Sequence, residues 1–211
     1  MSFWDRIAKF YDIAESFNGK VYREMCDITR RFVPSGAKVL DCAAGTGELS
    51  FSAAVRAESV VCTDLSENML NTAKRKAAKR GFSNITFEER NIFDLKDPDG
   101  IYDIVIAGNV LHLLDNPKDA VKELYRVTKS GGKILLPTFT NSTNNKGQNM
   151  VKLYSMIGFK ESKSYTPSMY CDMLRECIDE INSSNISGKA DLQHKLIRGT
   201  IPCCYAVITK N

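Results

Sequence analysis

The chain has 211 residues, of which 43% are hydrophobic and 26% are charged, and its formal net charge at pH 7 is +4. This composition is ordinary for a soluble globular protein, and the length suits one domain with a full core. No apolar stretch approaches the length of a membrane span and the amino terminus lacks a signal-peptide pattern, so we expect a cytoplasmic protein. Seven cysteines, an odd number, favour reduced thiols over a disulfide framework.

Two amphipathic helices are predicted before the first strand. Apolar residues recur at helical spacing from Phe3 to Ala14 and again from Val21 to Phe32, with a break at Asn18-Gly19. Apolar helix faces of this kind usually pack on the domain core.

The stretch KVLDCAAGTGEL, from Lys38 to Leu49, predicts a strand followed by a ligand-binding turn. Its apolar run is too short for a helix and suits a strand buried on both faces, which places Asp41 at the carboxyl end. Gly45 and Gly47 allow the backbone to approach a ligand closely. In an open α/β sheet, ligands bind at this edge.

A second strand is predicted over Ser59–Thr63 and ends at Asp64, which lies 17 residues beyond Gly47. This is close to the spacing at which a βαβ unit presents a carboxylate to two ribose hydroxyls. Asp64 could instead cap the next helix, from about Glu67 to Lys79, but Ser66 can serve as that cap and leave Asp64 for a ligand.

Short apolar runs continue to alternate with helical segments, which predicts a doubly wound parallel sheet. The further strands are predicted over 84–88, 102–107 and 133–137, with a helix from Asp115-Asn116-Pro117 to about Thr128. After Phe139 the pattern breaks into polar segments and short helices over 150–157 and 167–177. Two final strands are predicted over Ile178–Ile186 and Ile201–Thr209.

The motif D-C-A-A-G-T-G that begins at Asp41 resembles the first motif of the class I S-adenosylmethionine-dependent methyltransferases. This variant, with Ala43 where the family more often has its first glycine, is similar to that of the quinone-biosynthesis C-methyltransferases. The resemblance implies a Rossmann-like seven-stranded sheet, mostly parallel, with a C-terminal antiparallel hairpin. It also implies methyl transfer from S-adenosylmethionine to a small-molecule acceptor.

The same resemblance implies one domain over residues 1–211. Within it we expect an amino-terminal helical lid (1–33), a cofactor-binding core (36–137), a substrate-cap insertion (138–177) and the C-terminal hairpin (178–211). The cap interpretation also fits the length of the polar connection after the fifth strand, since such connections in compact domains tend to be functional.

The family's motifs assign a set of site residues to this chain. Asp64 would bind the ribose, Met69 would lie against the adenine, and Asp94 would accept the adenine amino group. His112, after the fourth strand, and Tyr11, on the lid, are candidate general bases, although a histidine among leucines is as well explained as a core residue. The expected cofactor-binding residues are Asp41, Ala43, Gly45, Thr46, Gly47, Asp64, Leu65, Met69, Asn91, Ile92, Phe93, Asp94 and Asn109.

Two other functions remain open. A nicotinamide-dependent oxidoreductase would use the same sheet, but Ser50 stands where its fingerprint has a third glycine. Asp41 and Glu48, before and after the glycines, also suit a cationic ligand better than a pyrophosphate. A non-catalytic S-adenosylmethionine-binding protein is not excluded.

Other partners receive little support from the sequence. Basic residues from Lys74 to Arg80 spread around a solvated helix face without interleaved aromatic residues, so nucleic-acid binding is not expected. The cysteine spacing matches no structural zinc site, and we expect no metal. The expected partner is the small-molecule acceptor, and the expected assembly is a monomer or a homodimer.

Overall fold

The structure is a computed structural model and describes residues 18–141, 165–184 and 189–211. The predicted helix from Phe3 to Ala14, with Tyr11, lies outside the described residues, and so does the predicted helix over 150–157.

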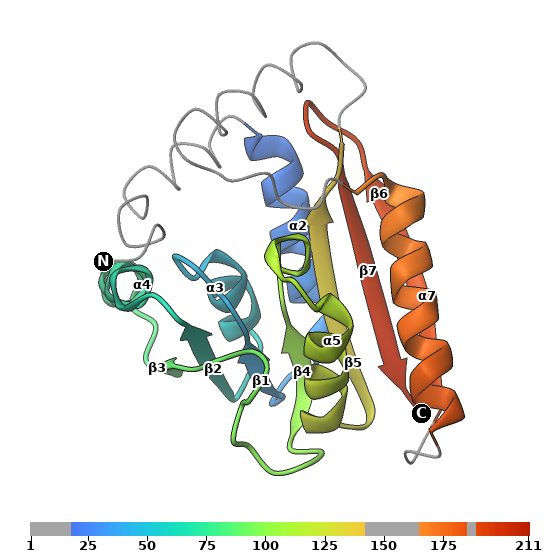
Figure 1. The fold of residues 1–211 in the computed structure, drawn as a ribbon. Coiled ribbons are helices and arrows are strands. Elements are labelled where there is room, and N and C mark those ends of the chain that lie inside the picture. The colour runs from blue at the N-terminus through green and yellow to red at the C-terminus, as the bar shows by residue number, and fades with distance from the viewer. Residues whose placement is uncertain (1–17, 142–164, 185–188) are drawn as a thin grey trace.

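Seven strands form one sheet within the described residues, in the order β3-β2-β1-β4-β5-β7-β6 (Figure 1). β7 runs antiparallel to β5 and β6, and the first five strands are parallel. The predicted mostly parallel sheet with a C-terminal antiparallel hairpin is confirmed. The strands are β1 (Lys38–Asp41), β2 (Ser59–Asp64), β3 (Ile85–Glu89), β4 (Tyr102–Ile106), β5 (Thr128–Phe139), β6 (Ala190–Ile197) and β7 (Cys203–Lys210).

Helices cover both faces of the sheet (Figure 1). On one face lie α2 (Gly19–Phe32), α3 (Glu48–Ala54) and α4 (Glu67–Arg80), and on the other lie α5 (Pro117–Val127) and α7 (Pro167–Ser183). Val39 and Leu40 of β1 are fully buried and belong to the cores on opposite faces. This double burial is what the apolar run predicted, because a central parallel strand has no solvent-exposed side.

The predicted strand over Ile178–Ile186 is wrong, because α7 continues to Ser183. Leu174, Ile178 and Ile181 are buried at helical spacing against the α5 side of the sheet. The strand that pairs with β7 is β6, an edge strand whose central residues are largely exposed. The hairpin therefore occupies less of the chain than 178–211.

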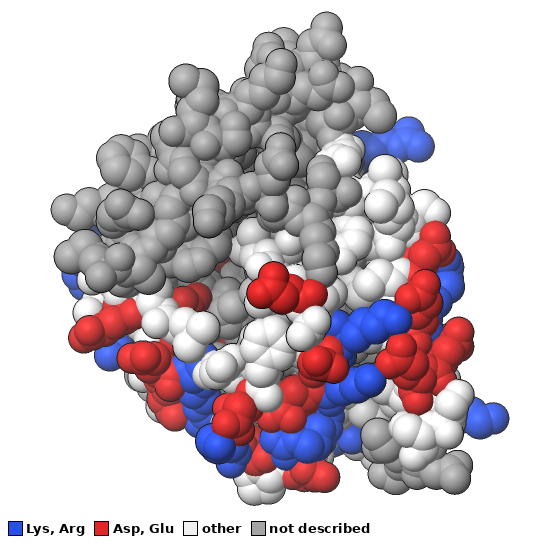
Figure 2. Space-filling model, in the orientation of Figure 1, with Lys and Arg blue, Asp and Glu red and all other residues white. Residues whose placement is uncertain are grey.

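The charged surface of α5 and α7 is held by ion pairs between the two helices. Lys118 contacts Glu176 at 2.9 Å and Glu180 at 3.0 Å, and Lys122 contacts Glu180 at 2.8 Å. On the face drawn in Figure 2, acidic and basic side chains are interspersed and form no large patch of one sign. These exposed pairs contribute little individually, because solvent screens them.

A buried hydrogen bond joins α2 to β7. The hydroxyls of Thr29 and Tyr205 lie 2.7 Å apart, and Thr29 also donates to the carbonyl of Met25 at 3.0 Å. We expect Tyr205→Phe to lower the free energy of unfolding by about 1 kcal/mol, because a buried hydrogen bond is lost while Thr29 keeps its bond to Met25. Urea denaturation followed by circular dichroism measures this, and an unchanged midpoint would contradict it.

Candidate functional site

A cavity opens at the carboxyl ends of β1, β2, β3 and β4. Apolar and glycine residues dominate its lining, and its polar side chains are Asp64, Arg90 and Asn109. The lining residues are Ala43, Gly45, Asp64, Leu65, Met69, Arg90, Ile92, Gly108, Asn109, Val110, Leu113 and Leu114. Seven of these were expected from the sequence to bind a cofactor, and the other five were not.

The glycine turn between β1 and α3 has left-handed backbone geometry at Ala43 (φ 51°), Gly45 (φ 57°) and Gly47 (φ 88°). Glycine is required at position 47, because a Cβ there would lie 2.9 Å from Cζ of Phe51 and 3.1 Å from Cβ of Ala73. The turn therefore packs directly against α3 and α4, with Ala43 and Gly45 at the cavity.

Asp64 fixes the turn to the tip of β2. Its Oδ2 accepts a hydrogen bond from the Gly45 amide at 2.8 Å, and its Oδ1 accepts one from the Ser66 amide at 2.9 Å. Ser66 caps α4 by accepting from the Met69 amide at 3.3 Å, as the sequence predicted. Each carboxylate oxygen has a further lone pair, so Asp64 can still accept hydrogen bonds from ligand hydroxyls.

Asp41 lies beneath the turn rather than on the cavity wall, and only 1% of its surface is exposed. Its Oδ2 accepts the Ser50 hydroxyl at 2.6 Å, and its Oδ1 has no partner among the described residues. Burial raises the pKa of Asp41 to about 7, with the charge of Asp64 adding to the rise and the Ser50 bond opposing it.

Glu48 does not supply the second carboxylate that the sequence suggested for a cationic ligand. It contacts Lys76 Nζ at 3.1 Å, and Arg80 holds both of its oxygens at 2.8 Å. Its charge is therefore neutralised by α4. The Thr46 hydroxyl likewise accepts from Lys76 at 2.9 Å, and neither Thr46 nor Gly47 lines the cavity.

The loop after β3 brings only part of its expected residues to the cavity. Ile92 lines the cavity, and Met69 of α4 does so too. Asn91 instead accepts the Phe93 amide at 3.0 Å and shapes the turn. The Asp94 side chain is 57% exposed and pairs with Lys96 at 2.5 Å, away from the cavity lining. The interpretation of Asp94 as the adenine acceptor therefore does not fit its position.

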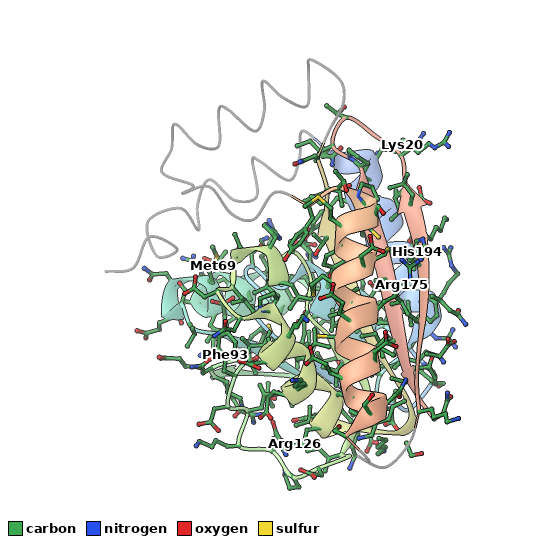
Figure 3. The ribbon with its side chains drawn as sticks, turned by 45° about the vertical axis from the view of Figure 1, so that its right-hand side comes forward. Lys20, Met69, Phe93, Arg126, Arg175 and His194 are labelled. Atoms are coloured by element: carbon green, nitrogen blue, oxygen red, sulfur yellow. The ribbon has the colours of Figure 1, made fainter. Side chains whose placement is uncertain are left out.

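Phe93 also lies outside the cavity lining, with 41% of its surface exposed. Figure 3 places it on the same side of the molecule as Met69. Leu65 is more exposed still, at 62%, although it lines the cavity. Of these two exposed side chains, only Leu65 is positioned for a ligand in the cavity to cover it.

Asn109 joins the loop after β4 to the end of β5. Its backbone has φ 54°, its amide donates to the Pro137 carbonyl at 2.8 Å, and its side-chain oxygen accepts the Phe139 amide at 2.8 Å. Asparagine tolerates this left-handed geometry better than most residues. The polar residue in the cavity wall is thus held by two hydrogen bonds to β5.

His112 lies in the short 3₁₀ helix η1 (Leu111–Leu113), between cavity-lining neighbours but outside the lining itself. Its Nδ1 is buried and has no partner among the described residues. Burial lowers the pKa of His112 to about 4, so the imidazole is neutral at pH 7. A neutral imidazole can accept a proton, although the structure does not bring His112 to the cavity surface.

The lining residues that the sequence reasoning missed are Arg90, Gly108, Val110, Leu113 and Leu114. Arg90 directly follows β3, and this position at a strand end was the available signal. The apolar members carried no chemical signal. In the described part of the chain, no group of three or more histidines, cysteines or acids could hold a metal. None of the helices in these residues combines the length and the hydrophobicity that a membrane span requires.

Comparison with known proteins gives consistent results. A family model described as a methyltransferase domain matches residues 34–195. A ubiquinone/menaquinone biosynthesis C-methyltransferase from Zymomonas mobilis is 29% identical over 71% of this chain and 63% of its own length. The protein of the same name from Bdellovibrio bacteriovorus is 34% identical over 62% of this chain and 60% of its own length. The chain thus spans less than two thirds of these relatives.

Among solved structures, a candidate S-adenosyl-L-methionine-dependent methyltransferase from Methanococcus maripaludis superimposes with a TM-score of 0.72. The match covers 100% of this chain and 95% of the other, at 20% identity. At this level of identity the similarity shows a shared fold.

The raised pKa of Asp41 predicts how stability depends on pH. The folded chain binds this proton more tightly than the unfolded chain, whose aspartates titrate near 3.8. The stabilisation is therefore complete below about pH 4 and is lost as the pH rises through about 7. Asp41→Asn cannot ionise, so it does not lose this stabilisation as the pH rises. The unfolding free energy of the variant minus that of the wild type should therefore be larger at about pH 8 than at about pH 5.

Urea denaturation of both proteins at the two pH values measures this difference. The asparagine keeps an oxygen for the Ser50 hydroxyl, which makes the substitution nearly isosteric. A constant difference between variant and wild type would show that Asp41 does not titrate in this range.

Proposed function

Because this chain belongs to the methyltransferase domain family, we propose that it transfers a methyl group from S-adenosylmethionine to a small-molecule acceptor. The observation that carries the proposal is Asp64, a carboxylate at the tip of β2 that bonds the glycine turn and lines the cavity. A turn joined to a strand-tip acid suits a nucleoside whose ribose donates two hydrogen bonds.

The residues around the cavity fit this cofactor. Ala43 and Gly45 leave the turn backbone open to close approach, and Asp64 would bind the ribose. Leu65, Met69 and Ile92 would enclose the adenine with apolar surface. The unpartnered oxygen of Asp41 adds negative potential beneath the turn, which favours a positively charged ligand once the group is ionised.

S-adenosylmethionine, when bound, would supply an electrophilic methyl group, because the positively charged sulfur that carries it is a good leaving group. The chain contributes chiefly by holding the acceptor in near-attack geometry, and the apolar wall of Val110, Leu113 and Leu114 would exclude water there. We further propose His112 as the general base, since burial leaves its imidazole neutral at pH 7 and its neighbour in η1, Leu113, lines the cavity.

The acceptor class is an inference from the relatives, which are named for ubiquinone and menaquinone biosynthesis. The apolar lining suits an aromatic acceptor such as a hydroquinone, in which a ring carbon would receive the methyl group. The lid over 1–33 with Tyr11 and the cap over 138–177 remain predictions. So do a cytoplasmic location and a monomeric or homodimeric state.

The first test is cofactor binding. We expect calorimetry to detect binding of S-adenosylhomocysteine and no binding of NAD, which would exclude the oxidoreductase alternative. Asp64→Asn should weaken that binding at least about tenfold, because the neutral amide cannot accept both ribose hydroxyls. Asp94→Asn is the matched control and should bind as the wild type does, since Asp94 does not line the cavity. Equal affinities of the Asp64 variant and the wild type would exclude the proposed ribose contact.

The second test concerns catalysis. His112→Ala should slow release of S-adenosylhomocysteine with a hydroquinone acceptor roughly 100-fold, because a general base is lost, and should leave cofactor affinity unchanged. The control is His194→Ala, on the exposed edge strand β6 and far from Met69 (Figure 3). If the His112 variant turned over at the wild-type rate, His112 would be excluded as the general base, and catalysis would rest on positioning of the acceptor. If the wild type turned over none of the acceptors in a broad panel, a non-catalytic binding protein would be favoured.

A further inference from the structure

Lys76 contacts the residues on both sides of Gly47. Its ammonium donates to the Thr46 hydroxyl at 2.9 Å and to Glu48 Oε1 at 3.1 Å. Thr46 and Glu48 belong to the glycine turn and the start of α3, whereas Lys76 lies 30 and 28 residues away on α4. A single cation from another helix thus joins the two ends of the bend at Gly47.

The geometry of Gly47 makes this contact possible. Gly47 is the N-cap of α3 with φ 88° and ψ 12°. The bend directs the side chains of both neighbours toward α4, where Lys76 meets them. A Cβ at Gly47 would collide with Phe51 and Ala73, so the turn lies close against α3 and α4, within reach of Lys76.

The contact is partly shielded from solvent. About a fifth of each side chain is exposed, 20% for Lys76 and 19% for Glu48, so salt screens the pair less than a surface ion pair. Arg80 grips the same carboxylate with two nitrogens at 2.8 Å, and its guanidinium lies 4.7 Å from the Phe51 ring centroid. Glu48 is therefore fixed independently, and it orients the Lys76 ammonium toward Thr46.

The helix α4 consequently holds the turn at two points. At the start of the helix, the Ser66 amide bonds Asp64, and Asp64 bonds the Gly45 amide. Farther along the helix, Lys76 bonds Thr46, the residue next to Gly45. Gly45 and Asp64 line the cavity, whereas Thr46 and Lys76 do not. Lys76 thus reaches the cavity through the turn and is not part of the cavity wall.

We propose that Lys76 is a positioning residue for the cofactor, which acts through the Thr46 hydroxyl to hold the glycine turn in its binding conformation. The inference rests on the proposed function, because it assumes that the turn binds S-adenosylmethionine. It requires that loss of the Lys76–Thr46 contact weakens cofactor binding more than it weakens the fold.

The experiment is a double-mutant cycle read by calorimetry with S-adenosylhomocysteine as the probe. Lys76→Met keeps the aliphatic stem and removes the charge, and Thr46→Val removes the hydroxyl. Each should weaken binding by about tenfold, and the double variant should bind no more weakly than Lys76→Met alone, because the Lys76–Thr46 contact is lost in both single variants. In turnover, the KM for S-adenosylmethionine should rise while kcat stays unchanged.

Two controls separate positioning from a general structural role. Thr46→Ser keeps the hydroxyl and should retain wild-type affinity. If Thr46 acted only by filling space, the affinity of Thr46→Ser would not exceed that of Thr46→Val. Lys79→Met removes an exposed lysine from the same helix and should bind normally. Thermal unfolding of every variant shows whether affinity falls without a matching fall in stability.

Unchanged affinity in Lys76→Met, or losses that add in the double variant, would overturn the inference. If Lys76→Met does not fold, the Thr46→Ser and Thr46→Val pair decides, since equal affinities of that pair would also overturn it. A wild-type chain that binds neither S-adenosylhomocysteine nor S-adenosylmethionine would overturn the proposed function and this inference with it.

Discussion

The hydrogen bond from the Gly45 amide to Asp64 is the interaction on which the site depends. It exists because β1 and β2 are parallel neighbours, so that their carboxyl ends meet at one edge of the sheet. One end of the bond belongs to a backbone that must bend in left-handed geometry, and the other belongs to a carboxylate that also faces the cavity. Any change in the pairing of these two strands would separate the turn from its acid.

The two strand-tip acids have different environments and therefore different roles. Asp41 is enclosed beneath the turn with one oxygen unpartnered, and its pKa rises to about 7. Asp64 accepts hydrogen bonds from two backbone amides, and its side chain lines the cavity. A cationic ligand above the turn would favour the ionised form of Asp41, whereas an anionic ligand would favour its protonated form. The arrangement thus selects for positive charge without a direct ion pair.

The sequence predicted the features that depend on local pattern, such as the double burial of β1 and the Ser66 cap. It failed where a side chain's partner lies far along the chain. Glu48 was expected to face a ligand, but its partners Lys76 and Arg80 come from another helix. The edge strand β6 was missed because its exposed residues lack an apolar alternation. The helical spacing of Ile178 and Ile181 with Leu174 was present in the sequence and would have extended the predicted helix past Cys177.

The polar residues of the cavity wall are each held by the protein before a ligand arrives. Asp64 bonds two backbone amides, Asn109 bonds the Phe139 amide, and Arg90 contacts the carboxylates of Glu88 and Asp97. Binding then need not order these side chains, which lowers its entropic cost. Methyl transfer from an activated donor depends on geometry more than on proton transfer. A site for this chemistry therefore benefits most from contacts that fix the turn and the wall, and the residues that make them lie largely outside the cavity.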